Sequence, residues 1–176
     1  MKTAFILALI VAVVNIASSI TRIVDTNGAG TYTSINAAIQ ASTAGDTVKV
    51  WPGNYSEQVN LNKDIVLLGS GYETTILTSY ADPTVRMSMG KLLWFTVSSL
   101  GGDGINLTGG ILRNCVINSC LQSGIYSDSG TAFVENSIMV NNGLSGVFAN
   151  GGTLNVTNCI SRSNAYYGFD RNPDLG

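Results

Sequence analysis

The chain has 176 residues, a formal net charge of -2 and only 11% charged residues. Its basic residues are few and scattered, so the composition excludes the electrostatic footprint of a nucleic-acid-binding protein. The sequence has no histidine, which excludes Ser-His and Cys-His nucleophiles and histidine-rich metal sites.

The N-terminus has the pattern of a secretory signal peptide. Lys2 precedes an apolar run over residues 4–14, and the small residues Ala17 to Ser19 follow where a signal peptidase cuts. The run is too short to span a membrane, so we predict a signal peptide over 1–19, with a retained amphipathic anchor as the alternative. The mature chain, 20–176, is then one domain without a membrane span that is secreted, periplasmic or at the cell surface.

A short helix is expected next, followed by short strands. Thr33 or Ser34 can cap a helix that carries Ile35, Ala38 and Ile39 on one face. Such a helix can cover the open end of the first coil of a solenoid. Strands separated by turn residues are predicted over 45–50, 57–61, 65–68 and 74–77.

The segments YTSINAAIQA, AGDTVKVWPGNYSEQV and DIVLLGSGYETTIL lie between Tyr32 and Leu77. They resemble the opening of secreted parallel β-helix proteins of the pectin lyase-like superfamily, especially pectin methylesterases and parallel β-helix repeat proteins. The resemblance implies an all-β fold: a single-stranded right-handed parallel β-helix (β-solenoid) with a short N-terminal capping helix.

Within this opening, Gly53, Tyr55 and Glu57 match the Gly-x-Tyr-x-Glu motif of pectin methylesterases. The family's catalytic motifs, Gln-Asp-Thr and Asp-Phe-Ile-Phe-Gly, do not occur in this chain. Because the paired carboxylates that the mechanism requires are missing, we interpret the motif as part of the framework. Tyr55 is expected to pack and Glu57 to stay solvated at the start of a strand.

The second half of the chain repeats a pattern at a spacing of 22 residues. Asn114, Asn136 and Asn158 each lie between apolar residues two positions before and two after. This period predicts a solenoid of about six or seven coils, with equivalent residues in columns. Since the apolar residues alternate, the asparagines are expected to face inward and form a hydrogen-bonded ladder. Trp94, in the same column, is expected to fill the core.

Outward columns follow from the same alignment. One of them holds Asn106, Tyr126, Phe148 and Asp170. Tyr126 and Phe148 would stand one coil apart as an aromatic strip on which sugar rings can stack, with ordinary cross-strand packing as the alternative. Arg113 and Glu135 share another outward column and are expected to form a surface ion pair.

The cysteines Cys115, Cys120 and Cys159 show no metal-ligand spacing. Cys115 and Cys159 share a column but lie two coils apart, about 9.6 Å, beyond the disulfide reach of about 7 Å. We therefore interpret the cysteines as buried small residues, with a disulfide as the alternative in a secreted protein.

A resemblance to pectate lyases would require a cluster of aspartates that binds calcium. The candidates Asp103, Asp128 and Asp170 fall in different columns, so we interpret them as turn residues. No metal or cofactor is predicted, and calcium is the alternative ligand.

The C-terminal repeat ends at Asn172-Pro173 without a second capping helix. An uncapped coil exposes unpaired backbone groups. We expect either that the chain is the front part of a longer protein or that this coil pairs with another copy. Light scattering of the mature chain tests both, since a stable monomer contradicts them.

Two functions fit these features. The first is a secreted or cell-surface repeat scaffold, non-catalytic as it stands, that presents its polar and aromatic face to a polysaccharide or cell-surface glycan. The second is the N-terminal part of an enzyme that acts on acidic polysaccharide, a pectin methylesterase-like esterase or a lyase, whose catalytic residues lie beyond residue 176. No catalytic residue is assigned within the chain.

Overall fold

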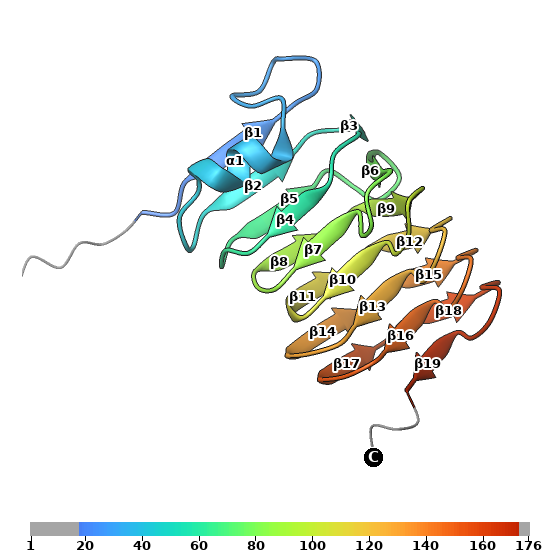
Figure 1. The fold of residues 1–176 in the computed structure, drawn as a ribbon. Helices are drawn as coiled ribbons and strands as arrows, with labels where there is room; N and C mark the ends of the chain where they lie inside the picture. The colour runs from blue at the N-terminus through green and yellow to red at the C-terminus, as the bar shows by residue number, and fades with distance from the viewer. Residues whose placement is uncertain (1–17, 173–176) are drawn as a thin grey trace, which may run out of the picture.

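The computed structural model describes residues 18–172, which form a parallel β-solenoid with one short helix (Figure 1). The predicted all-β fold class and the capping helix are confirmed. Most of the predicted signal peptide, residues 1–17, lies outside the described residues. Within the described part, no helix is long and apolar enough to cross a membrane.

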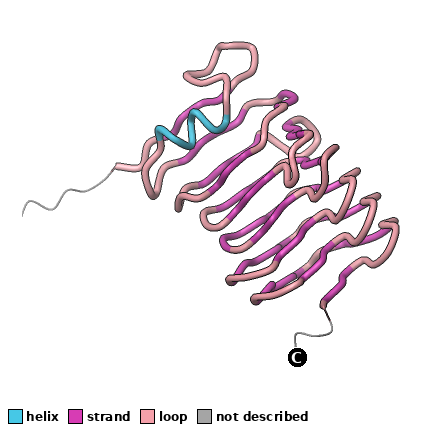
Figure 2. The backbone as a smooth tube through the Cα atoms, viewed as in Figure 1, coloured by secondary structure: helices cyan, strands magenta, loops and turns pink. Residues whose placement is uncertain are grey.

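Each complete coil contributes one strand to each of three parallel sheets, which Figure 2 shows as stacked magenta segments joined by loops, and a strand that precedes the helix adds a seventh to the first of them. Sheet A has seven strands: β1 (Thr21–Val24), β2 (Thr47–Val50), β5 (Val66–Gly69), β8 (Lys91–Leu93), β11 (Gly109–Arg113), β14 (Thr131–Glu135) and β17 (Thr153–Thr157). Sheet B has six: β3 (Gly53–Tyr55), β6 (Thr75–Ser79), β9 (Thr96–Ser99), β12 (Val116–Asn118), β15 (Ile138–Val140) and β18 (Ile160–Arg162). Sheet C has six: β4 (Val59–Leu61), β7 (Val85–Met87), β10 (Ile105–Leu107), β13 (Ile125–Ser127), β16 (Val147–Ala149) and β19 (Phe169–Arg171).

The core is a set of inward columns inside the coil. In sheet A, Leu67, Leu92, Leu112 and Val134 are paired in register on successive strands, and all four are fully buried. Removing such columns from water is the main stabilising contribution to folding.

Helix α1 (Ile35–Ala41) closes the N-terminal end of the stack. Ser34 is its N-cap, and its side chain accepts a hydrogen bond from Ala37 N. Ile35, Ala38 and Ile39 are buried against the first coil. The predicted cap and apolar face are therefore confirmed.

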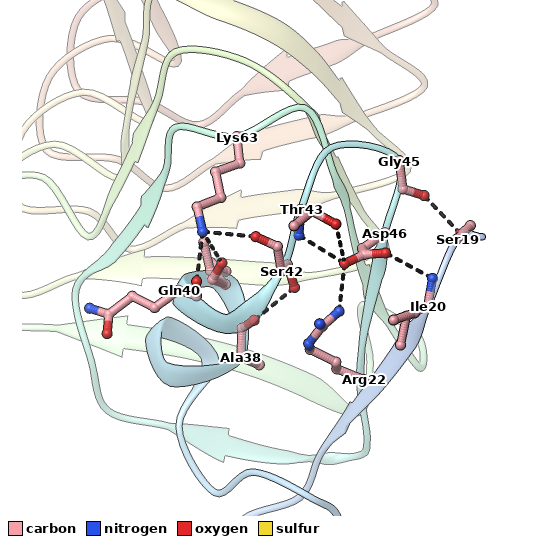
Figure 3. A network of polar contacts seen from close by, with 11 residues as sticks. Ser19, Ile20, Arg22, Ala38, Gln40, Ser42, Thr43, Gly45, Asp46 and Lys63 are labelled. Atoms are coloured by element: carbon pink, nitrogen blue, oxygen red, sulfur yellow. Dashed lines mark hydrogen bonds and ion pairs between the residues drawn. The ribbon is translucent and has the colours of Figure 1, made fainter. Parts of the chain in front are cut away.

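Lys63 holds the other end of α1. Its Nζ donates to the carbonyl oxygens of Ile39, Gln40 and Ser42 at 2.9, 2.7 and 2.9 Å, and most of this network is visible in Figure 3. A cation at the C-terminal carbonyls also complements the helix dipole. The Lys63 ammonium group therefore stabilises the C-terminal end of α1.

Asp46 joins the first strand to the turn after α1 (Figure 3). Its buried carboxylate accepts hydrogen bonds from Thr43 N and Ile20 N, both at 2.8 Å, and pairs with Arg22 Nη1 at 2.6 Å. The Thr43 and Ile20 amides, and then Arg22, hold the pKa of Asp46 well below its ordinary value.

A pH dependence of stability follows from Asp46. Because its pKa is lowered in the folded state, its contribution is fully present above the unfolded carboxyl pKa of about 4 and is lost as the pH falls further. We expect Asp46→Asn to lower the melting temperature at pH 7 and to lose less additional stability between pH 5 and pH 3 than the wild type. Thermal unfolding followed by circular dichroism measures this. Asp64→Asn, at an exposed carboxylate, is the control; an equal pH response of Asp46→Asn and the wild type would contradict the assignment.

The predicted orientation of Asn114, Asn136 and Asn158 is wrong. The three residues have φ values of 56°, 50° and 51° and lie at the corner between sheets A and B. None is buried, and Asn158 Nδ2 donates to Asn136 Oδ1 at 2.8 Å on the exposed side of the corner. Asparagine tolerates this left-handed conformation, so the residues turn the chain and do not fill the core.

The left-handed residue also shifts the alternation of side chains. The inward residue after each corner asparagine is the next one, namely Cys115, Ser137 or Cys159. Val116, Ile138 and Ile160 therefore face outward and not, as the alternation predicted, into the core.

The core prediction for Trp94 is wrong for the same reason. Trp94 occupies the equivalent corner with a φ of 65°, and it is 39% exposed. Its ring lies against Tyr72, outside the coil.

A hydrogen-bonded asparagine pair, one member buried and the other partly buried, lies at the corner between sheets B and C. Asn142 is 2% exposed; its Oδ1 accepts from Cys120 N at 3.1 Å, and its Nδ2 donates to Asn164 Oδ1 at 3.0 Å. Asn164 Nδ2 donates in turn to Met139 O and to Ser161 Oγ. This is an inner ladder of the kind that was expected at the other corner.

The cysteines are free thiols. Cys115 and Cys120 are buried, as predicted, and Cys159 is partly buried. Burial raises the pKa of each thiol, for Cys115 and Cys120 to about 12.

Ser127 carries a buried hydroxyl without a hydrogen-bond partner in the described part of the chain. We expect Ser127→Ala to raise the free energy of unfolding by about 1 kcal/mol, because an unpaired polar group is removed from the core. Urea unfolding measures the change. The matched control is Ser137→Ala, since Ser137 Oγ accepts from Cys115 N and donates to Glu135 O; it should destabilise by about 1 to 2 kcal/mol. A loss of stability in Ser127→Ala would show that this hydroxyl has a partner.

The last described coil is the least buried. Ile160 and Phe169 are 54% and 51% exposed, and Leu154 and Val156 are only partly buried. Self-association through this coil stays a prediction.

Candidate functional site

An outward column runs along the whole of sheet C. Its six rungs are paired in register on successive strands. From the N-terminal end they are Asn60, Arg86, Asn106, Tyr126, Phe148 and Asp170. The predicted column from Asn106 to Asp170 is confirmed, and the structure extends it by two rungs towards α1. We call these six residues the sheet C strip.

Tyr126 and Phe148 form the aromatic section of the strip. Their ring centroids are 5.9 Å apart and their planes are tilted by 55°. Asn150 Nδ2 donates to the Tyr126 hydroxyl at 2.9 Å, which fixes the direction of the ring. Both residues are partly exposed, so the pair offers apolar ring surface to solvent beside polar groups, an arrangement on which sugar rings can stack.

A hollow of about 770 Å³ lies between α1 and the first strands of sheet C. It contains the first three rungs of the strip, Asn60, Arg86 and Asn106. Asn36 and Gln40 of α1 form the opposite wall. The Asn36 amide is engaged by Glu57, Gln58 O and Asn60 N. The amides of Gln40, Asn60 and Asn106 can both donate and accept hydrogen bonds, so the lining suits a ligand with many hydroxyl groups.

Arg86 is the cation in this hollow that the fold leaves accessible. It is exposed, and its Nη2 donates to Asp82 O at 2.8 Å. Among the described residues, neither of the two ion pairs involves Arg86. Lys63 also lines the hollow, but its ammonium group is bonded to the end of α1.

In the motif of Gly53, Tyr55 and Glu57, the tyrosine packs as expected, whereas the glutamate does not stay solvated. Tyr55 is 2% exposed and its hydroxyl donates to Trp51 O at 2.8 Å, so it packs. Burial raises its pKa. Glu57 is not a solvated side chain: its carboxylate accepts from Ile35 N and Asn36 N, at 2.7 and 3.2 Å. The glutamate therefore holds the N-terminus of α1.

The three aspartates considered as calcium ligands lie apart. Asp103 precedes β10, Asp128 follows β13, and Asp170 is in β19. Residues 18–172 contain no cluster of three carboxylate, cysteine or histidine side chains that could hold a metal ion. Burial, and to a smaller extent the carboxylate of Asp82, raises the pKa of Asp103, although Ser123 N donates to it. Asp170 accepts from Ser145 Oγ at 3.3 Å.

The hollow was not predicted from the sequence. The strip could be aligned only where the repeats have similar lengths, whereas Val59 and Val85 of neighbouring coils are 26 residues apart. A signal was nevertheless present, because Asn60 and Arg86 each lie between two buried apolar residues, as Asn106 does.

Comparison with known proteins identifies the fold. No protein-family model matches the chain, and no curated protein sequence matches it significantly. Among solved structures, the pectin methylesterase from carrot matches with a TM-score of 0.65 and 20% identity, over 81% of this chain and 53% of the carrot protein. The pectin methylesterase PemA from Erwinia chrysanthemi matches with a TM-score of 0.59 and 10% identity, over 74% of this chain and 54% of that protein. The chain thus has the β-helix fold of these proteins and spans about half their length.

Proposed function

We propose that the protein is a secreted or cell-surface β-helix scaffold, non-catalytic as it stands, that binds a polysaccharide or cell-surface glycan along the sheet C strip. The observation that carries this proposal is the register of the strip. Polar rungs in a hollow continue without interruption into a pair of partly exposed aromatic rings. Rungs in a parallel sheet are about 4.8 Å apart, so an extended sugar chain laid along the stack would meet one rung after another.

The two sections of the strip would have separate roles. Tyr126 and Phe148 would stack on the apolar faces of sugar rings. Asn60, Asn106 and Arg86 would bond to hydroxyl or carboxylate groups, with Arg86 favouring an acidic sugar.

A glycan array followed by calorimetric titration of the mature chain tests the proposal. The double variant Tyr126→Ala, Phe148→Ala should weaken the binding of acidic glycans by about tenfold or more, since stacking on the two rings at about 0.5 to 1.5 kcal/mol each is worth about 1 to 3 kcal/mol. Phe133→Ala is the matched control, because Phe133 is an exposed aromatic residue on sheet A of the same coil. Arg86→Gln should weaken the binding of acidic glycans more than that of neutral ones. Unaltered binding of acidic glycans by the double variant would contradict the proposal.

A second candidate is the N-terminal part of a polysaccharide-active enzyme whose catalytic residues lie beyond residue 176. The observation in its favour is that the chain spans about half the length of the two pectin methylesterases. Assays of the mature chain on pectin and polygalacturonate, with and without calcium, separate the candidates in part. Activity of this chain alone would overturn the non-catalytic proposal.

A further inference from the structure

Trp94 has a backbone conformation that is unfavourable for its side chain. Its φ is 65°, and the same corner is occupied in the next three coils by Asn114, Asn136 and Asn158. A bulky residue in the left-handed region is uncommon and costs conformational energy that asparagine largely avoids. Strain of this kind persists only where the surrounding structure holds it, and it occurs often at binding sites.

The neighbouring coil makes room for this corner. A Cβ atom at Gly69, in the strand below, would clash with the Trp94 carbonyl oxygen. Gly69 is therefore required for the close approach of the two chains. The loop over residues 70–74, between β5 and β6, carries Tyr72, whose ring lies against Trp94.

The rings of Trp94 and Tyr72 are almost parallel, with an interplanar angle of 10° and centroids 6.3 Å apart. Neither covers the other fully, since Trp94 is 39% and Tyr72 is 37% exposed. The rings are stacked on each other, so the outer ring face that stays exposed can take a flat ligand. A cage for a quaternary ammonium group would instead need rings that surround the cation.

The loop that carries Tyr72 is fixed by hydrogen bonds. Thr96 Oγ1 donates to Tyr72 O at 2.6 Å, and Thr75 N donates to Gly71 O at 2.8 Å. Ser70 N donates to Thr75 Oγ1 at 2.9 Å. The aromatic pair is therefore held in place before any ligand arrives, which lowers the entropic cost of binding.

A hollow of about 280 Å³ lies beside the pair, lined by Ser70, Gly71, Tyr72, Glu73, Thr74 and Trp94. Its only charged side chain is Glu73, which is exposed and forms neither of the two ion pairs among the described residues. A carboxylate beside an aromatic ring accepts hydrogen bonds from sugar hydroxyls and repels an acidic sugar. The lining thus differs in charge from the hollow that contains Arg86.

We propose that Tyr72, Glu73 and Trp94 form a second saccharide subsite, which takes a neutral hexopyranose unit. One ring face of the sugar stacks on the aromatic pair, and the Glu73 carboxylate accepts hydrogen bonds from its hydroxyls. The subsite lies at the corner between sheets A and B, and none of its three residues belongs to sheet C. It is therefore separate from the sheet C strip and does not depend on binding there.

Fluorescence titration tests this subsite. The chain has two tryptophans, so the variant Trp51→Phe leaves Trp94 as the single reporter. We expect saturable quenching or a blue shift with the neutral probe cellohexaose or with a neutral galacto-oligosaccharide. Oligogalacturonate and choline should produce at least about tenfold weaker responses. A choline response stronger than the sugar responses, or no saturable response to either neutral sugar, would overturn the proposal.

Trp94→Asn is the decisive variant because it places at this corner the residue that the next three coils use. Its melting temperature should be unchanged or raised, whereas calorimetry should show that binding of the neutral oligosaccharide falls at least about tenfold. Glu73→Gln removes the charge that repels an acidic sugar, so the ratio of the affinities for neutral and acidic sugar should fall. Tyr126→Ala, Phe148→Ala should leave this binding unaltered, so failure of the sheet C strip and failure of this subsite are distinguishable. Equal affinity of Trp94→Asn and the wild type would contradict the assignment.

Discussion

Replacing Glu57 by alanine is expected to lower the free energy of unfolding by about 3 kcal/mol, or the melting temperature by about 6 to 12 °C for a domain of this size. The carboxylate accepts four hydrogen bonds at the start of α1: from Ile35 N, from Asn36 N and Nδ2, and from Ser34 Oγ. A negative charge at these amides also complements the helix dipole. Helix α1 has only seven residues and closes the first coil. Unfolding of α1 would therefore expose the apolar face of the helix that includes Ile35.

Urea and thermal unfolding measure the effect of Glu57→Ala. Glu57→Gln keeps an acceptor and removes the charge, so an intermediate loss is expected. Glu73→Ala is the matched control at an exposed glutamate and should change the stability by less than about 0.5 kcal/mol. Equal stability of Glu57→Ala and Glu73→Ala would mean that the contacts with α1 contribute nothing. That result would also restore the expectation of a solvated Glu57.

Asn142→Leu is expected to destabilise the fold by about 3 to 4 kcal/mol. The substitution leaves Cys120 N without its acceptor, and it removes one of the two donors to Asn164 Oδ1, the other being Asn142 N. Each buried group left unpaired costs about 1 to 3 kcal/mol. The site also has no room for a different shape, because a Cβ at Gly124 would already lie 2.8 Å from Asn142 Nδ2.

Asn136→Gly provides the comparison at the exposed corner. Glycine keeps the left-handed conformation and removes only the exposed hydrogen bond with Asn158. We expect a change within about 0.5 kcal/mol, as for other exposed sites. If Asn136→Gly proved as costly as Asn142→Leu in denaturant unfolding, the outer asparagine column would be the one that stabilises the stack.

The coil architecture was predictable because the later repeats have equal lengths. At a spacing of 22 residues, Tyr126 pairs with Phe148, as the alignment required. Arg113 and Glu135 also meet, with Nη2 and Oε2 2.6 Å apart. Such pairings follow from counting alone, since equivalent residues in a stack must be neighbours. Whether Tyr126 and Phe148 bind sugar stays a proposal.

The predicted side-chain orientations were wrong where the inward and outward alternation of a strand is interrupted. A left-handed residue such as Asn114 ends the alternation of inward and outward side chains, so an apolar residue on each side does not place the asparagine in the core. The inner ladder was overlooked for a related reason. Asn142 and Asn164 are also 22 residues apart, but Cys120 takes their place in the preceding coil. The role of Glu57 depends on α1, which no local pattern connects to it.

Because the last coils are equal in length, duplication of one coil can extend the solenoid. Residues 125–146 form one complete circuit, whose first residue is in register with Val147 of the next. A tandem copy of this circuit would meet the same neighbours above and below as the original does. Duplication of a short gene segment could therefore lengthen an outward face such as the sheet C strip one rung at a time, without changes to the surrounding rungs. The N-terminal coils, whose circuits differ in length, do not offer that freedom.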